Sequence, residues 1–389
     1  MIYDFDTHID RRVSGAVKWV DLPEGIIPLN IADMEFKIMP EVVDEMIKTA
    51  QYGDFGYIGM TETDYQAVIN WIEKRRGVKV PREHIIATPG VLYAARIALS
   101  ILTNPGDKVI VQTPLHTPSI ATPCIMDRIK LENRLIYKDG TYYIDYDNLE
   151  SLFKDGAKVL MMCAPQNPTG RVWTYEELKK VGEIVKKYNG YIICDEIHSD
   201  IVWNGNIHVS PTQIPEIADR SIGVFSTSKT FNMGGFHVGT AIVPNPDLRD
   251  KMVKAFYSIG HVCDRPAVMC MRAQTAAYTK GEKWLEEMLA YVGDNFNYTL
   301  NALKNTPIRA TQPEGTFLLW CDIESLNWDA KKLRNVMFND WKVLPDPGSY
   351  YDTKDWATYT GLEHHIRLNL ALPKSTLVEA IDRITKYFK

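Results

Sequence analysis

The sequence has few cysteines and no long apolar run. The six cysteines among its 389 residues are scattered and form no C-x-x-C pair, so a disulfide framework is not expected. No stretch approaches the roughly 18 consecutive apolar residues that a membrane span needs. Residues 1–6 are acidic rather than basic, which argues against a secretory signal. Together these absences predict a cytoplasmic protein whose cysteines are reduced core thiols.

The sequence also lacks a strong charge of either sign. The formal net charge is −5, from 44 Lys and Arg against 49 Asp and Glu. It gives no electrostatic reason to expect nucleic acid or a membrane as a partner. With 45% hydrophobic and 24% charged residues, the composition is that of an ordinary soluble globular protein. The length suffices for one large body and a smaller companion.

Several common functional motifs are missing. The sequence contains no G-x-G-x-x-G after an apolar run, no Walker loop, no G-x-S-x-G and no H-E-x-x-H. Their absence argues against the nucleotide-binding, hydrolase and zinc-protease classes that use them. The adjacent His364 and His365 could not both bind one metal ion from a strand, because neighbouring side chains point to opposite faces. No metal site is therefore expected.

Short apolar runs rich in β-branched residues recur between amphipathic stretches. They do not alternate with polar residues, which is typical of strands buried on both faces of a parallel sheet. The runs are residues 108–111, 158–162, 191–194, 222–225 and 240–243. Between them, Thr174 and Glu177 fit a capping box at the start of an amphipathic helix. The pattern predicts an α/β fold with a mostly parallel central sheet between helices.

The pattern changes after about residue 282. The elements expected there are two helices and two strands, over residues 283–303, 377–388, 315–320 and 365–370. We therefore predict a large domain over residues 46–282 and a smaller α+β domain over residues 283–389. Residues 1–45 are rich in loop signals, and we expect them to pack on the small domain.

Three polar residues follow successive apolar runs, at the predicted carboxyl ends of strands. Asn167 lies in a turn framed by proline and glycine, and Asp195 and Lys229 follow the next two runs along the chain. Open α/β sheets bind ligands at these strand ends. Taken alone, Asp195 fits a helix cap as well as a ligand-binding group. Lys229 likewise fits an exposed lysine as well as a desolvated amine of lowered pKa.

In combination, these motifs resemble those of the fold-type I pyridoxal-phosphate (PLP) enzymes, the aspartate aminotransferase superfamily. The resemblance covers essentially the whole chain. It rests on N-P-T-G at 167–170, D-E at 195–196 and S-x-S-K at 226–229. More narrowly, A-D-M-E-F at 32–36 and D-E-I-H-S-D at 195–200 are similar to the MalY/PatB branch of cystathionine β-lyase-type C–S lyases. The PLP-dependent transferase-like fold implied by this resemblance has a large and a small domain.

The resemblance implies how the cofactor would be held. Lys229 would bind PLP covalently and then act as the base that removes the substrate Cα proton. Asp195 would pair with the pyridine nitrogen, and Asn167 would hydrogen-bond the phenolate oxygen of the ring. The other cofactor contacts would come from a helix N-terminus that binds the phosphate, from two serines and from two histidines. These residues are Gly90, Val91, Leu92, Ser226, Ser228, His116 and His198.

The resemblance also implies substrate and subunit contacts. Arg367 would bind the α-carboxylate of a small amino-acid substrate, with Asn167 beside it; a surface arginine is the alternative. Tyr57 corresponds to a catalytic tyrosine that reaches the cofactor phosphate of the neighbouring subunit, so the resemblance implies a homodimer with shared active sites. Tyr93 and Trp320 could line the pocket, although core packing fits each of them better.

Two positions depart from the family pattern. Where lyases of this branch commonly have a tyrosine stacked on the pyridine ring, the sequence has His116. This histidine is either a neutral stacking ring, which we favour, or a group that transfers protons near neutral pH. Eight residues after Lys229, where many superfamily aminotransferases have a phosphate-binding arginine, the sequence has His237. The C–S lyase branch also lacks that arginine.

The resemblance predicts a PLP-dependent carbon–sulfur β-lyase that converts L-cystathionine or an S-substituted cysteine to a thiol, pyruvate and ammonia. The same residues would serve an aminotransferase of an L-amino acid, which remains the alternative. A protein that binds PLP but acts through protein contacts is disfavoured, because both Lys229 and Arg367 are present. We expect substrate selectivity to depend on residues 31–36 and 350–360.

Overall fold

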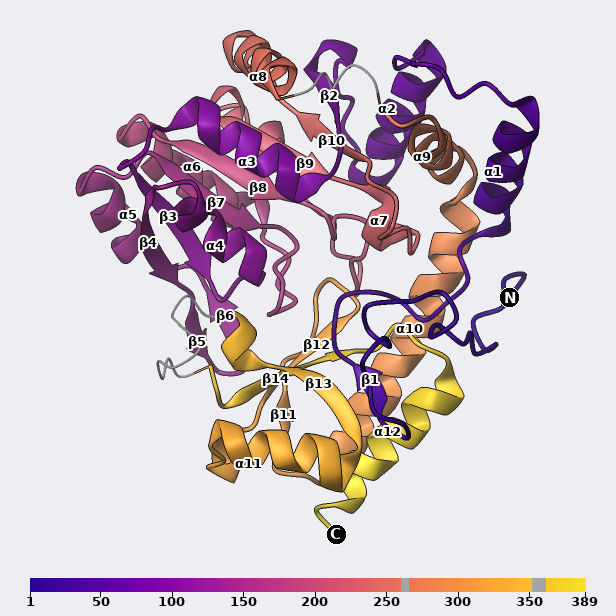
Figure 1. Ribbon diagram of the computed structural model, residues 1–389. Helices are drawn as coiled ribbons and strands as arrows, with labels where there is room; N and C mark the ends of the chain where they lie inside the picture. Colours follow the sequence, from indigo (N-terminus) through magenta and orange to yellow (C-terminus); the bar gives the residue numbers. More distant parts are fainter. Residues whose placement is uncertain (260–265, 352–361) are drawn as a thin grey trace.

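A computed structural model describes residues 1–259, 266–351 and 362–389. The larger of its two main sheets has seven strands (Figure 1). In spatial order they are β2 (Ile85–Thr88), β10 (Gly239–Ile242), β9 (Ser221–Phe225), β8 (Tyr191–Asp195), β7 (Val159–Cys163), β3 (Lys108–Thr113) and β4 (Ile129–Arg134). The strands from β9 to β4 pair in parallel, whereas β10 is antiparallel to both of its neighbours.

All five apolar runs form strands of this sheet, but the run at 240–243 differs from expectation in direction. It forms β10, which pairs antiparallel to β9. The connection from β9 to β10 contains only one four-residue helix, α7 (Thr227–Thr230). A parallel partner would require a crossover that covers one face of the sheet. A strand buried on both faces has the same composition in either direction, so the run itself could not reveal this.

Helices cover both faces of the large sheet. On one face, side chains of α3 (Val91–Leu102) and α8 (Pro246–Ser258) form an apolar core that includes Val159 and Met161 of β7. On the other face, α5 (Tyr146–Lys154) and α6 (Tyr175–Lys187) pack over Leu160 and Met162 of the same strand. Successive residues of β7 thus enter opposite cores, which explains the uninterrupted apolar runs. The predicted capping box of α6, Thr174 with Glu177, is present.

The second sheet has five strands. In spatial order they are β1 (Ile27–Leu29), β13 (Val343–Pro347), β14 (His365–Asn369), β12 (Leu318–Asp322) and β11 (Arg309–Ala310). All pairs are antiparallel except β1 with β13. The strand expected over 315–320 begins only at Leu318, because Thr316 has a φ of 67° that a strand does not allow.

The helices α10 (Glu282–Leu303) and α12 (Lys374–Lys386) contact each other beside this second sheet. A short helix, α11 (Ala330–Asn335), runs into the π-helical segment Val336–Trp341. Elsewhere, α1 (Pro40–Tyr52) and α2 (Glu62–Arg76) pack on α9 (Val268–Lys280). The remaining regular elements are α4 (Thr117–Ile125), the hairpin of β5 (Ile136–Lys138) and β6 (Thr141–Tyr143), and the 3-10 turns Arg82–His84, Pro211–Gln213, Ala218–Arg220, Glu324–Leu326 and Gly348–Tyr351.

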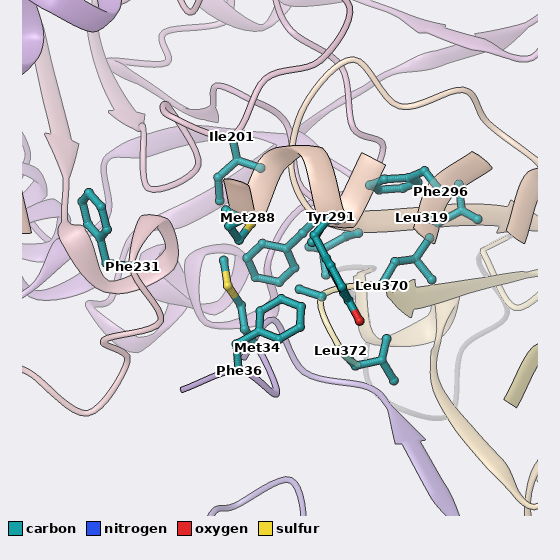
Figure 2. Packing of buried hydrophobic residues seen from close by; sticks show 14 of the residues in the cluster. Met34, Phe36, Ile201, Phe231, Met288, Tyr291, Phe296, Leu319, Leu370 and Leu372 are labelled. Carbon is teal, nitrogen blue, oxygen red and sulfur yellow. The ribbon is translucent and has the colours of Figure 1, made fainter. Parts of the chain in front are cut away.

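The N-terminal segment packs into a core that it shares with α10 and the second sheet. Figure 2 shows Met34 and Phe36 of this segment beside Met288 and Tyr291 of α10. The rings of Phe36 and Tyr291 meet edge to face, with centroids 5.6 Å apart. Burial of these apolar side chains fixes the segment against the molecule. Within the described ranges, none of the helices is long and apolar enough to cross a membrane.

Candidate active site

A cavity of about 600 Å³ lies between the two sheets, at the carboxyl ends of β7, β8 and β9. Ligands of open α/β sheets bind at such strand ends. The cavity wall contains most of the residues that the sequence singled out. They are Gly90, Val91, Leu92, His116, Asn167, Asp195, His198, Ser226, Ser228, Lys229 and Arg367. The second sheet contributes Arg367, and the N-terminal segment contributes Ile31 and Ala32.

One end of the cavity is the N-terminus of α3. Gly90 precedes this helix with a φ of 137°, a backbone conformation that a residue with a side chain adopts only under strain. The backbone N–H groups of the first turn have no partner within the helix and carry the positive end of its dipole. Ser226 and Ser228 also line the cavity. The Ser226 hydroxyl donates to the Val238 carbonyl at 2.6 Å and accepts from the Ser228 N–H at 3.1 Å.

The amine of Lys229 points from α7 toward the N-terminal segment. Its Nζ donates to the carbonyl oxygen of Ala32 at 2.5 Å. Burial lowers the pKa of Lys229, and the nearby Arg367 lowers it further, whereas Asp33 and Asp195 oppose the shift. A desolvated amine of lowered pKa is a better nucleophile and base at neutral pH. Of the two alternatives for this lysine, the geometry favours the desolvated amine.

Asp195 ends β8 and faces the cavity. Its carboxylate accepts the Ile197 N–H at 3.0 Å. Burial raises the pKa of Asp195 to about 6, and the neighbouring Glu196 contributes to the rise. The residues that follow form a turn rather than a helix, so Asp195 is not a helix cap.

A buried ionic network holds the backbone behind Asp195. Arg76 of α2 donates to Glu196 at 2.9 Å and to the Ser199 hydroxyl at 2.8 Å. His208 lies 3.1 Å from the same Glu196 carboxylate. This network ties the end of β8 to α2 and thereby limits the positions that the Asp195 side chain can adopt.

Arg367 is a buried residue of β14, with 3% of its surface exposed, so it is not a surface arginine. Its Nη1 donates to the side-chain oxygen of Asn167 at 2.8 Å, and its Nη2 donates to the carboxylate of Asp346. The Nε has no hydrogen-bond partner among the residues that the structure describes. An unpaired buried N–H is costly, and the residue that carries it lines the cavity.

Three histidines line the cavity: His116, His198 and His237. The ring of His116 is open to the cavity. Desolvation by the surrounding cavity wall nevertheless lowers its pKa to about 4, and the nearby cations Lys229 and Arg367 contribute to this shift. A smaller shift would already leave it neutral at pH 7, which favours the stacking ring over the proton-transfer group. His198 is 1% exposed, and neither ring nitrogen has a partner within the described part of the chain. Burial lowers its pKa well below the usual range.

The three aromatic residues that the sequence singled out, Tyr57, Tyr93 and Trp320, lie in different environments. Tyr57 lies between α1 and α2, is 90% exposed and does not line the cavity of its own chain. Tyr93 lines the cavity and is 38% exposed, so the expectation of core packing is wrong for it. Its ring stacks on that of Phe256, a buried residue of α8. Trp320 is buried, as expected, and donates to the Tyr142 hydroxyl at 2.9 Å.

Two charged residues of the cavity wall, Asp346 and Arg96, were not expected from the sequence. Asp346 lies in β13 within the stretch V-L-P-D-P-G, and its prolines and glycine resemble a loop rather than a strand. The signal that could have identified Asp346 was its position directly after the short apolar stretch V-L-P at residues 343–345. The expected selectivity segment 350–360 is mostly outside the described residues, which resume at residue 362.

The groups on the cavity wall fit PLP. A helix N-terminus with free N–H groups suits the phosphate, and a carboxylate suits the protonated pyridine nitrogen. The amine of Lys229 suits the aldehyde. The buried His198, whose ring nitrogens are unpaired, faces the same cavity and offers a further polar contact. Among the described residues, no three His, Cys, Asp or Glu side chains cluster to hold a metal ion.

Comparison with known proteins identifies similar chains. The family model of class I and II aminotransferases matches residues 24–384. The cystathionine β-lyase PatB of Bacillus subtilis (strain 168) is 32% identical over an alignment of 391 positions, which covers 98% of this chain and 98% of that one.

Two solved structures are similar over nearly the whole chain. The crystal structure of cystalysin from Treponema denticola, which contains a PLP cofactor, has a TM-score of 0.92 and 33% identity. The match covers 99% of this chain and 98% of that chain. The PLP-bound C–S lyase of Staphylococcus hominis, in complex with the inhibitor L-cycloserine, has a TM-score of 0.89 and 26% identity. That match covers 100% of this chain and 99% of that chain.

Proposed function

Since the chain belongs to the class I and II aminotransferase family, we propose that it is a PLP-dependent carbon–sulfur β-lyase. Its substrate would be L-cystathionine or another S-substituted cysteine, and its products a thiol, pyruvate and ammonia. The similarity to a cystathionine β-lyase and to a C–S lyase over the full chain supports this assignment. The observation that carries it is the meeting of the Lys229 amine, the Asp195 carboxylate and the Arg367 guanidinium in one cavity.

In the proposed reaction, some residues of the cavity bind the substrate and others bind the cofactor. When bound, PLP supplies the electron sink that stabilises negative charge at the substrate Cα. Arg367 and Asn167 hold the α-carboxylate. The charge-assisted hydrogen bond from Arg367 to this carboxylate orients the Cα–H bond. The Lys229 amine takes the Cα proton. Asp195 keeps the pyridine nitrogen protonated, and His116 offers a neutral ring face beside it.

The overall reaction conserves atoms without an external oxidant. The Cα–H and Cβ–S bonds break, and the sulfur leaves as a thiolate that is protonated to the thiol. The remaining enamine adds one water molecule and yields pyruvate and ammonia. No oxo acid is consumed, in contrast to amino-group transfer.

The test incubates the PLP-loaded protein with L-cystathionine and no oxo acid. Pyruvate is measured with lactate dehydrogenase, and free thiol with a chromogenic disulfide. We expect both products in equal amounts over many turnovers. An aminotransferase would transfer about one amino group per site and then stop, and a protein that only binds PLP would form neither product. Either outcome would contradict the lyase assignment.

We further propose a cytoplasmic homodimer in which Tyr57 reaches the partner's active site. Tyr52 is the last residue of α1, and Phe55 and Tyr57 follow it; the three residues are 83%, 57% and 90% exposed. Clustered large aromatic side chains on a surface are typical of an interface. The described cysteines form no disulfide, and Cys163, Cys194 and Cys321 are buried, which supports a reducing compartment.

We also retain the division into domains as a proposal. The seven-stranded sheet, with strands from β2 to β10, supports a cofactor-binding domain over residues 46–282. The antiparallel strands from β11 to β14 support a small domain over residues 283–389. The pairing of β1 with β13 supports the packing of residues 1–45 on the small domain.

A further inference from the structure

One buried carboxylate in the cavity wall has no role in the function proposed above. Asp346 lies in β13, is 5% exposed and lines the cavity. Its Oδ2 accepts hydrogen bonds from three different segments of the chain. The donors are Nη2 of Arg367 on β14, the backbone N–H of Ile31 at 2.9 Å and the hydroxyl of Tyr351 at 3.0 Å.

The Ile31 contact matters because this residue has an unfavourable backbone conformation. Its φ of 54° is rare for a β-branched residue and persists only where the surroundings enforce it. Asn369 provides the second restraint, since its side-chain nitrogen donates to the Ile31 carbonyl at 2.7 Å and to the Asp33 carbonyl at 2.8 Å. Between these two carbonyls lies that of Ala32, which accepts from the Lys229 amine at 2.5 Å.

Asp346 is therefore connected both to the group that would bind the substrate carboxylate and to the segment that meets the proton-transferring amine. A guanidinium has five N–H groups. Asn167 and Asp346 each take one of them in Arg367, and Nε has no partner in the described part of the chain. Donors thus remain for a second carboxylate. Asp346 compensates the buried charge of Arg367 and limits the rotation of its plane.

We propose that Asp346 is a positioning residue that sets the requirement for an α-carboxylate. It fixes the guanidinium plane of Arg367 and, through the Ile31 N–H, holds residues 31–33 over the Lys229 amine. The inference rests on the proposed role of Arg367 in substrate binding. Capture of the carboxylate and placement of the amine are then coupled through one side chain.

The alternative role for Asp346 is purely structural, the neutralisation of a buried arginine. A structural role predicts that its loss lowers thermal stability and weakens all ligands alike. A positioning role predicts a loss that depends on the carboxylate of the ligand. Two probes separate these cases, because L-alanine and ethylamine differ only by a carboxylate and neither can eliminate a thiol.

The experiment titrates the PLP-loaded protein with each probe and follows the absorbance of the bound cofactor. For Asp346→Asn we expect at least a tenfold larger dissociation constant for L-alanine, and a change within twofold for ethylamine. Asp340→Asn is the matched control, since Asp340 is exposed and precedes β13, and it should leave both constants unchanged. Equal weakening of both probes, or of neither, would overturn the proposal.

A second variant keeps the test valid if Asp346→Asn does not fold. Asp346→Glu preserves the charge that compensates Arg367 but displaces the carboxylate oxygens. We expect it to bind PLP with a normal thermal midpoint and to weaken L-alanine at least fivefold. Wild-type binding of L-alanine by this variant would show that only the charge matters. Because neither probe carries a sulfur leaving group, the result is independent of whether the wild-type protein cleaves cystathionine.

Discussion

Lys229 and Asp195, two charged groups of the cavity wall, both have pKa values shifted by their surroundings. Burial lowers the pKa of Lys229 and raises that of Asp195, so each environment disfavours the charged form of its residue. A bound pyridinium would reverse the effect on Asp195, because a positive charge nearby favours the carboxylate. The cavity of the protein without cofactor thus contains unfavourable electrostatics that cofactor binding relieves.

Lys229→Ala should abolish turnover, because the variant loses both the covalent link to PLP and the base. We expect a decrease in kcat of about 1,000-fold or more, together with loss of the absorbance band of the lysine-bound cofactor. Lys251→Ala, at an exposed position of α8, is the control and should behave as wild type. A variant at position 229 that retains turnover would contradict the site assignment.

Asp195→Asn should stabilise the cofactor-free protein at neutral and alkaline pH. The folded-state pKa of about 6 exceeds the unfolded value, so stability present at low pH is lost as pH rises toward and through 6. The amide avoids that loss. We expect a free energy of unfolding about 1–2 kcal/mol higher than wild type at pH 8, and a smaller difference at pH 5.

Urea unfolding of the cofactor-free protein at both pH values measures this effect. Asp250→Asn, at an exposed position of α8, should show no such pH dependence. With PLP bound, the Asp195 variant should lose activity. A stability difference that does not grow with pH would show that burial does not perturb this carboxylate.

At the level of elements, the site depends on where strands and helices end. Asp195 ends β8, Lys229 follows the end of β9, and Gly90 precedes α3. Parallel strands bring their carboxyl ends to one edge, and each of these ends places one functional group there. Short, restrained terminal segments such as α7 leave their side chains few alternative positions.

Gly90→Ala should weaken cofactor binding, because the φ of 137° at this position strains any residue with a Cβ. We expect a loss of about 1–3 kcal/mol in PLP affinity. Gly235→Ala is the matched control, since a Cβ there meets no atom within 4 Å and its φ is not in the unfavourable range. Fluorescence titration of the cofactor-free variants with PLP gives both affinities; equal affinities would contradict the expectation.

At the scale of the whole molecule, the cavity forms only where separate parts of the chain meet. The large sheet provides Asp195 and the segment with Lys229, the second sheet provides Asp346 and Arg367, and the N-terminal segment closes the remaining side. The apolar core in Figure 2 joins the N-terminal segment, α10 and the second sheet. Tyr57 lies on the surface instead, which is consistent with a role at a partner's site.

Mixing of two inactive variants should restore activity if Tyr57 acts across a dimer interface. Co-expressed Tyr57→Phe and Arg367→Ala subunits form mixed dimers in which one of the two sites has both wild-type residues. Random pairing in a two-fold dimer then predicts roughly a quarter of the wild-type activity. If Tyr57 served its own chain, no site would be intact, and activity would stay at the level of the separate variants.

The sequence determined five of the seven strands of the large sheet, the capped helix α6 and the functional groups at strand ends, because these depend on local apolar runs and turn residues. It did not determine the direction of β10, since a strand buried on both faces has no directional pattern. It also placed Tyr93 in the core, whereas this residue lines the cavity and is partly exposed.

Only the tertiary structure decided which distant groups meet. Arg367 and Asp346 lie on neighbouring strands of the second sheet, and Ile31 reaches them from the other end of the chain. Strand order and the closure of the N-terminal segment set these contacts, and both arise from burial of the whole apolar core. The chain therefore encodes locally which groups are available, while packing of the entire molecule determines their distances.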